Sequence, residues 1–120
     1  VPAVISPFVL ARIGPSHARE LFLTGERFDA RRARAIGLVH HVVAADELDD
    51  AVADRVTQLL QGAPGAQATI KELIRTVSFR PKESVRDYTA ETIARRRAGD
   101  EGREGMRAFL EKRKPWWQNE

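Results

Sequence analysis

Apolar residues recur at helical spacing along most of the chain, and this spacing predicts a succession of short amphipathic helices. Ser6-Pro7 suits a helix start, with serine as the N-cap and proline at the first helical position, and Gly14 ends that helix. A second helix is predicted from Pro15 or Ser16 to Gly25. The side chains expected to face inward are Phe8, Val9, Leu10 and Ile13 in the first helix and Ala18, Leu21 and Phe22 in the second.

The segment from residue 23 to residue 43 combines a turn, a short helix and an apolar run. Asp29 is a good N-cap because its carboxylate can accept N–H groups of the first helical turn. Gly37 suits the left-handed position that ends the same helix, with Ala33 and Ile36 facing inward. The period then changes, and the β-branched run Leu38, Val39, Val42 and Val43 predicts one short strand near residues 39–43.

Four further amphipathic helices are predicted in the rest of the chain, which makes the fold class mainly α. Their predicted starts are Asp46, Gln67, Ser84 with its capping partner Asp87, and Asp100, and their ends lie before Gly62, Phe79, Gly99 and Pro115. The tail carries Trp116 and Trp117, a large apolar area that needs cover. Contact with a second subunit is the favoured cover, and packing on the same chain is the alternative.

Composition narrows the class of protein. The 120 residues include no cysteine, which excludes a disulfide scaffold, a thiolate metal site and a cysteine nucleophile. No apolar run approaches the length of a membrane span, and the start Val1-Pro2-Ala3 has no basic signal-peptide region. We therefore expect a cytoplasmic protein with no membrane partner.

The charges leave one alternative function open. Twenty basic and seventeen acidic residues are mostly interleaved, which is typical of solvated helix faces. Only Arg95-Arg96-Arg97 and the cluster from Lys112 to Lys114 are concentrated enough to suggest an anionic partner. A non-enzymatic helical module that binds nucleic acid through these clusters would lose affinity steeply with salt.

No self-contained active site is visible in the sequence. There is no Ser/His/Asp set at recognisable spacing, no metal-ligand cluster and no glycine-rich phosphate loop. The glutamates fall on polar helix faces or turns, where solvated charge is the expected role. His17 is expected at the surface, and His40 and His41, adjacent on a strand, would point to opposite faces. No metal site is predicted.

Two motifs carry a family resemblance. The first is Leu23-Thr24-Gly25, Phe28-Asp29-Ala30, Ala33 and then Gly37-Leu38-Val39, whose joint spacing is more specific than any one piece. The second runs from Arg103 to Arg113, REGMRAFLEKR. Together they resemble the enoyl-CoA hydratase/isomerase (crotonase) superfamily, and the resemblance covers essentially the whole chain.

This resemblance implies an architecture. The chain would be the C-terminal helical part of a crotonase-like α/β fold, following a longer N-terminal portion of repeated β-β-α turns. Residues 1–45 would end the crotonase core, and residues 46–120 would form the helical trimerisation and coenzyme A contact region. The implied assembly is a homo-oligomer, either a trimer or a dimer of trimers. No specific nucleic acid partner is expected on this interpretation.

The resemblance also implies a chemistry. The substrate would be an acyl-coenzyme A thioester, with no covalently bound cofactor, and hydration of an α,β-unsaturated acyl-CoA is the favoured reaction. In the family, two backbone N–H groups stabilise the charge on the thioester oxygen, and two glutamates act as general acid and base. Both features belong to the portion that precedes Val1 in family members, so this chain alone is expected to be inactive.

Three positions match functional positions of the family. Ala3 matches the residue whose backbone N–H helps to hold the catalytic water. Phe109 and Lys112 match positions on the final helix that contact the adenine and the phosphates of coenzyme A, often across a subunit boundary. For Phe109, plain core packing is an equally weighted alternative.

One departure from the commonest hydratase pattern is informative. Where many members have a glycine pair and an arginine after the proline, this chain has Ile5-Ser6 and Val9. This pattern is similar to the branch that includes methylglutaconyl-CoA hydratases. Hydratase, isomerase and hydrolase chemistries all remain open.

Overall fold

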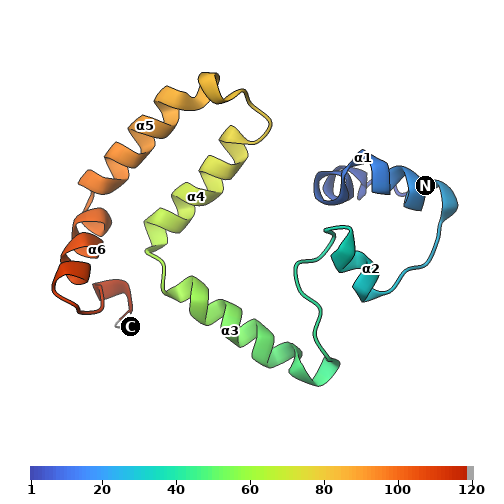
Figure 1. Ribbon diagram of the computed structural model, residues 1–120, viewed down its shortest axis with the longest axis horizontal. Helices are drawn as coiled ribbons and strands as arrows, with labels where there is room; N and C mark the ends of the chain where they lie inside the picture. Colours follow the sequence, from blue (N-terminus) through green and yellow to red (C-terminus); the bar gives the residue numbers. More distant parts are fainter. Residues whose placement is uncertain (119–120) are drawn as a thin grey trace. The chain divides into compact units, whose positions relative to one another are not determined.

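The computed structural model describes residues 1–118, and every regular element within them is a helix (Figure 1). The α-helices are α1 (Ser6–Thr24), α2 (Ala30–Ala35), α3 (Leu48–Leu60), α4 (Pro64–Val77), α5 (Lys82–Ala98) and α6 (Asp100–Leu110), and two short 3-10 helices are η1 (Ala45–Glu47) and η2 (Trp116–Gln118). The mainly α class is confirmed. The chain divides into two compact units, Val1–Ala51 and Val52–Glu120. The resemblance implies a different division, with the end of the crotonase core in residues 1–45 and the trimerisation and coenzyme A contact region in residues 46–120, and that division of functions stays a prediction.

Helix α1 is two helices joined at a glycine, as the sequence predicts. Gly14 has φ 69° and ψ 170°, a conformation outside the helical region that glycine adopts without steric cost, and Pro15 restarts the helix. The helix ends at Gly25, whose φ of 64° is left-handed. The predicted N-cap is wrong, because Ile5 occupies that position and the Ser6 hydroxyl donates a hydrogen bond to the Ala3 carbonyl at 2.8 Å.

The core of the first unit lies between the two halves of α1 and the residues around α2. Its buried members are Ile13, Ala18, Leu21 and Ile36, with Val9, Phe22 and Leu38 packed against them. The predicted inward positions of both helices are therefore largely confirmed. Phe8 and Leu10 differ, since both side chains are exposed.

Helix α2 follows its predicted caps, but the strand after it does not form. The Asp29 carboxylate accepts the Arg32 N–H at 2.8 Å, and Gly37 has φ 81°. Residues 39–43 form no strand within the described part of the chain. The reason is physical, because a strand needs a neighbouring strand for its backbone groups, and no other described segment provides one.

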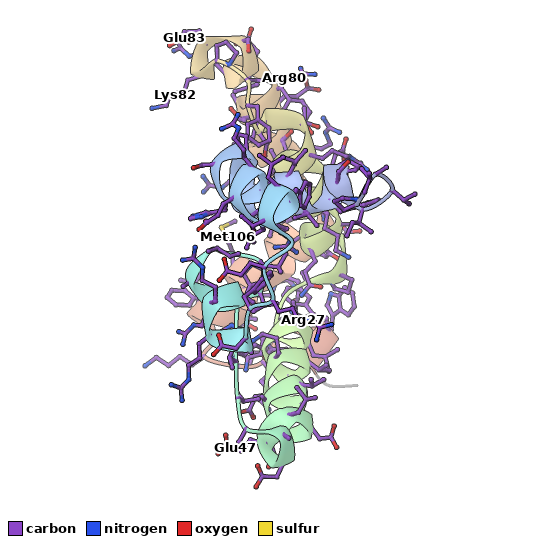
Figure 2. All side chains as sticks on the ribbon, turned by 90° about the vertical axis from the view of Figure 1, so that its right-hand side faces the viewer. Arg27, Glu47, Arg80, Lys82, Glu83 and Met106 are labelled. Carbon is purple, nitrogen blue, oxygen red and sulfur yellow. The ribbon has the colours of Figure 1, made fainter. Side chains whose placement is uncertain are left out.

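In the second unit, α4 and α5 run antiparallel beside each other, and α6 packs against α5 (Figure 1). The turn between α4 and α5 contains Phe79, whose φ is 66°, and Pro81, which precedes the new helix. Figure 2 shows Arg80, Lys82 and Glu83 pointing away from the ribbon at this turn. The short reversal therefore lets two amphipathic helices share one interface.

Three helix starts differ from the sequence prediction. Helix α4 begins at Pro64 and not at Gln67, because proline is favoured in the first helical turn. Helix α5 begins at Lys82, and the Ser84 hydroxyl donates to the Pro81 carbonyl at 2.8 Å, so Ser84 is no N-cap. Helix α3 begins at Leu48, and Asp46, its predicted cap, lies inside η1. The Glu47 carboxylate accepts the Ala44 N–H at 3.3 Å at the start of η1.

Helices α5 and α6 approach so closely at Gly102 that no side chain fits there. A Cβ atom built on Gly102 would overlap the Arg96 carbonyl oxygen and would lie 2.9 Å from the Arg97 Cα. Both are backbone atoms, which cannot rotate away as a side chain can. At Gly105, one turn later, a Cβ atom would make an ordinary contact of 3.5 Å with the Trp117 ring.

We expect these two glycines to respond in opposite directions to alanine. Gly102→Ala should lower the free energy of unfolding by about 1–3 kcal/mol, because the helices must separate to admit the methyl group. Gly105→Ala, the matched control, should raise it by roughly 0.5–1 kcal/mol, because alanine is the better helix former. Urea unfolding followed by circular dichroism measures both values. Equal effects of the two substitutions would contradict the close approach.

Candidate functional site

Ala3 lies in an exposed turn ahead of α1. Its N–H donates a hydrogen bond to the Val1 carbonyl at 2.9 Å, and its carbonyl accepts the Ser6 hydroxyl. To hold a water molecule, the Ala3 N–H would have to leave the Val1 oxygen. The proposed role of Ala3 therefore depends on a rearrangement of this turn.

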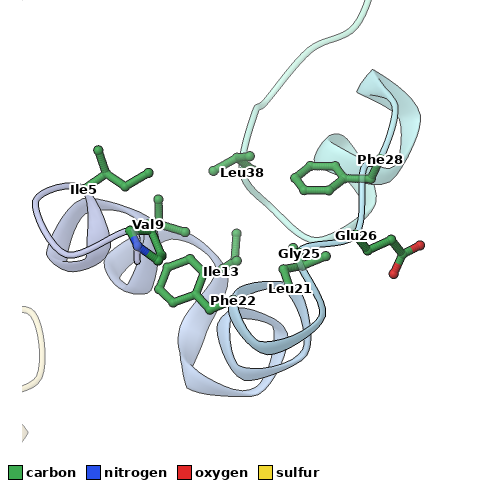
Figure 3. Close-up of a pocket in the computed structure, with 10 residues that line it drawn as sticks. Ile5, Val9, Ile13, Leu21, Phe22, Gly25, Glu26, Phe28 and Leu38 are labelled. Atoms are coloured by element: carbon green, nitrogen blue, oxygen red, sulfur yellow. The ribbon is translucent and has the colours of Figure 1, made fainter.

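A cavity of about 320 Å³ lies beside this turn in the first unit. Its lining is almost wholly apolar and consists of Pro2, Ile5, Val9, Ile13, Leu21, Phe22, Gly25, Glu26, Phe28 and Leu38. Figure 3 shows the Phe28 ring and Leu38 on the same side of the cavity, while the Glu26 carboxylate points outward. The cavity offers shape and hydrophobic contact, and its one carboxylate is directed to solvent.

The other two predicted residues lie together at the end of α6. Phe109 is 82 % exposed, which excludes core packing within the described residues. Lys112 follows the helix and is also exposed, and its N–H donates to the Phe109 carbonyl at 3.3 Å. The structure therefore brings an exposed aromatic ring and an exposed ammonium group to one helix end. Ala3 belongs to the other unit.

Lys112 adopts an unusual backbone conformation. Its backbone φ is 53°, in the left-handed region that residues other than glycine rarely occupy. The Arg113 N–H reaches back to the Ala108 carbonyl at 3.0 Å. With the bond from Lys112 to Phe109, this completes a Schellman motif, the common way to satisfy the last carbonyls of a helix.

Glu101 joins three helices through one carboxylate. Its two oxygens accept the Gly65 N–H at 2.8 Å and the Ala66 N–H at 3.0 Å, in the first turn of α4. Arg96 of α5 donates to the same carboxylate at 2.7 Å. A Cβ atom on Gly65 would lie 2.7 Å from a Glu101 oxygen, so a larger residue there would require the Glu101 side chain to shift.

The charge on Glu101 is stabilised by these donors. Its side chain is only 17 % exposed, and desolvation by burial raises the pKa of the carboxyl group. The hydrogen bonds from Gly65, Arg96 and Ala66 and the charge of Arg96 outweigh this effect, and the pKa is lowered overall. The carboxylate also favours the positive end of the α4 dipole.

Glu104 holds the segment after α6 against the helix. Arg113 donates to its two carboxylate oxygens at 2.5 Å and 2.9 Å, and the Trp116 N–H donates at 3.2 Å. The hydrogen bond from Arg113 is the main reason that the pKa of Glu104 is lowered, and the same pairing raises the pKa of Arg113. Arg113 also donates to Glu111 at 2.6 Å.

The tail is held by a second set of bonds. The Trp117 indole N–H and the Gln118 amide both donate to the Gln61 carbonyl, at 3.1 Å and 2.8 Å. The two tryptophan rings meet edge to face, with centroids 5.4 Å apart. Trp117 is therefore partly covered by its own chain, while Trp116 is about half exposed. The predicted subunit contact of the pair stays a prediction.

Sequence reasoning missed Glu101 and Glu104, because it treated every glutamate as solvated charge. The available signal was their place among arginines, in the run from Arg96 to Arg113. Two of the basic residues assigned to a nucleic-acid surface, Arg96 and Arg113, are neutralised by these glutamates. This compensation weakens the interpretation of the basic clusters as a binding face.

The histidines do not assemble a site with the acidic residues. His17 lies 3.9 Å from Glu20 at the surface, and His40 shares a hydrogen bond of 3.2 Å with Arg12. Among residues 1–118, no three His, Asp or Glu side chains come together in a way that could hold a metal ion. No helix in that range is both long enough and apolar enough to cross a membrane.

Comparison with known proteins decides the family. The family model of enoyl-CoA hydratase/isomerase matches residues 1–120. The chain belongs to this family. Its helices match the C-terminal portion expected from the two sequence motifs.

Relatives and solved structures agree with this placement. A carnitinyl-CoA dehydratase of Salmonella paratyphi A is 34 % identical over 107 residues, covering 86 % of this chain and 41 % of the relative. A Legionella pneumophila protein assigned to the enoyl-CoA hydratase/isomerase (crotonase) group is 43 % identical, with a TM-score of 0.90 over 98 % of this chain and 46 % of that one. An enoyl-CoA hydratase/isomerase of Marinobacter aquaeolei is 39 % identical, with a TM-score of 0.92 over 98 % and 45 %. The chain thus spans less than half the length of these relatives.

The lowered pKa of Glu101 generates a pH prediction. Because its folded pKa lies below the unfolded value, the carboxylate stabilises the fold fully above the unfolded pKa, and this contribution is lost as pH falls through the folded pKa. Glu101→Gln should lower stability by about 1 kcal/mol near neutral pH, and the difference from wild type should shrink as pH falls through the folded pKa of Glu101. Thermal unfolding over a series of pH values from neutral to acidic measures the effect.

Glu91→Gln is the matched control for this prediction. It breaks an exposed ion pair with Arg95 on the surface of α5, and exposed pairs contribute little. We expect it to change stability only slightly at any pH. A Glu101→Gln protein whose stability follows the wild type at every pH would contradict the role of the carboxylate at the start of α4.

Proposed function

We propose that the protein containing these residues acts on acyl-coenzyme A thioesters and that its reaction is the hydration of an α,β-unsaturated acyl-CoA. Membership of the enoyl-CoA hydratase/isomerase family supports this proposal. The carnitinyl-CoA dehydratase relative is named for the removal of water from a CoA ester, which is the reverse direction of the same chemistry. Isomerisation and hydrolysis of acyl-CoA are the other reactions that this family placement leaves open.

The observation that carries the proposal is the pairing of Phe109 and Lys112 at the end of α6. An exposed aromatic ring can stack on the adenine of coenzyme A, and an exposed ammonium group can pair with a phosphate. One hydrogen bond of 3.3 Å links the backbones of the two residues. The helix end thus presents both kinds of contact that the nucleotide part of the substrate requires.

The bond-making chemistry is proposed to lie mainly outside these residues. Addition of water to the double bond develops negative charge on the thioester oxygen, which needs preorganised N–H donors and carboxylates. Glu101 and Glu104 each accept hydrogen bonds from an arginine and from at least one backbone N–H group, so neither is poised for proton transfer. Ala3 would contribute one N–H donor to the water once its turn has rearranged.

We also propose that these helices join subunits into a homo-oligomer, either a trimer or a dimer of trimers. Large apolar side chains are exposed along α3, α4 and α6, namely Val52, Val56, Leu59, Leu60, Ile70, Ile74, Met106 and Leu110. Large exposed apolar side chains in this number are typical of surfaces that become covered in an interface. Sedimentation equilibrium of the purified protein measures the assembly directly.

The first experiment is turnover by the natural gene product that carries these 120 residues. Its intact mass is measured beside the hydration of crotonyl-CoA, followed by the loss of the absorbance of the conjugated thioester. Turnover by a protein larger than 13.5 kDa supports the proposal and directs the search for the catalytic glutamates to the additional residues. Turnover by a chain of 13.5 kDa would overturn the assignment of the chemistry to residues outside this segment.

Substitutions at the helix end test the coenzyme A contact. Lys112→Ala should raise the KM for crotonyl-CoA by about tenfold, because a charged hydrogen bond to phosphate is lost, while kcat changes little. Phe109→Ala should raise KM to a smaller extent. Lys114→Ala is the matched control and should leave KM unchanged, although it removes the same charge two residues later. Equal effects of Lys112→Ala and Lys114→Ala would argue for nonspecific charge attraction.

A further inference from the structure

Lys112 occupies a helix-terminal position where glycine is usual. Counted from the end of α6, Glu111 is the C-cap and Lys112 is the next residue, the left-handed position of the Schellman motif. Gly25 and Gly37 fill the left-handed positions after α1 and α2 in this same chain. The lysine therefore stands where the backbone would be more stable with a glycine.

The residues around Lys112 hold this conformation from both sides. Arg113, the next residue, is fixed on the Glu104 carboxylate by two hydrogen bonds and on Glu111 by a third. Glu104 also accepts the Trp116 N–H, which returns the tail to the helix. Glu104 is only 15 % exposed, so this bidentate pair is partly shielded from solvent. Lys112 thus lies in a turn that is tied to α6 on each side.

We propose that Glu104 and Arg113 are positioning residues that hold Lys112 in its left-handed conformation and so direct its ammonium group to a phosphate of the bound acyl-CoA. This inference rests on the proposed contact of Lys112 with coenzyme A. A lysine side chain has four rotatable bonds, so its charge reaches a given point only part of the time unless its backbone origin is fixed. Because the backbone of Lys112 is fixed next to Phe109, its side chain has fewer conformations to lose, and the entropy cost of binding coenzyme A is smaller.

The test measures the affinity of the natural gene product for coenzyme A by isothermal titration calorimetry. Four proteins are compared: wild type, Lys112→Ala, Glu104→Gln and the double variant. Alanine at position 112 keeps the backbone cost of the left-handed conformation and removes the ammonium group together with its aliphatic stem. Glutamine at position 104 keeps the shape of the side chain and removes the charge that orients Arg113.

We expect each single substitution to weaken binding by about tenfold and the double variant to bind no more weakly than Lys112→Ala. This result means that Glu104 acts through Lys112. If Glu104→Gln weakens binding by the same factor in both backgrounds, Glu104 only supports the fold and the inference is overturned. Arg113→Lys should behave as Glu104→Gln does, because lysine cannot form the bidentate pair.

Two further outcomes separate the inference from the proposed function. If Lys112→Ala leaves the affinity for coenzyme A unchanged, the proposed contact fails, and the positioning role fails with it. If Lys112→Ala weakens binding but Glu104→Gln does not, the contact stands and only the positioning role is wrong. Glu91→Gln serves as the control for loss of a carboxylate, and circular dichroism confirms that each variant retains its helices.

Discussion

The second unit depends on satisfying the backbone groups at its helix ends. Each α-helix leaves its first N–H groups and its last carbonyls without partners inside the helix. Here the partners come from other elements: Glu101 of α6 binds the start of α4, and the Gln61 carbonyl after α3 accepts bonds from Trp117 and Gln118. These polar bonds connect helices that share little apolar surface, and they set where α6 and its terminal turn lie within the unit.

Hydrophobic burial, in contrast, is small throughout the described residues. The buried apolar side chains are Ile13, Ala18, Leu21, Ala33, Ile36, Ala63 and Ala108, and four of these seven are alanines. Short helices are marginal in water unless an apolar face is covered. Covering the exposed apolar faces of α3, α4 and α6 with further protein surface would therefore stabilise these helices. The proposed association of subunits would supply such surface.

Local stereochemistry was predictable from the sequence, whereas long-range bonding was not. Gly14, Gly25 and Gly37 mark helix breaks because a left-handed or extended glycine is a property of the residue itself. The Asp29 cap likewise involves a donor only three residues away. The strand near residues 39–43 failed because a strand requires a partner that local pattern does not supply. Glu101 escaped notice because its amide donors lie 35 and 36 residues away.

Phe109 shows how structure resolves what a pattern leaves open. Its spacing with Met106 and Leu110 is that of an apolar helix face, which predicts either a core or a binding surface equally well. The exposure of all three side chains removes the first option within the described residues. Lys112 adds the second part of the argument, since its left-handed backbone costs about 1 kcal/mol that glycine would avoid. The ammonium group of Lys112 lies at the end of α6 where the helix dipole favours a positive charge, and under the proposed function the same group pairs with a phosphate of coenzyme A.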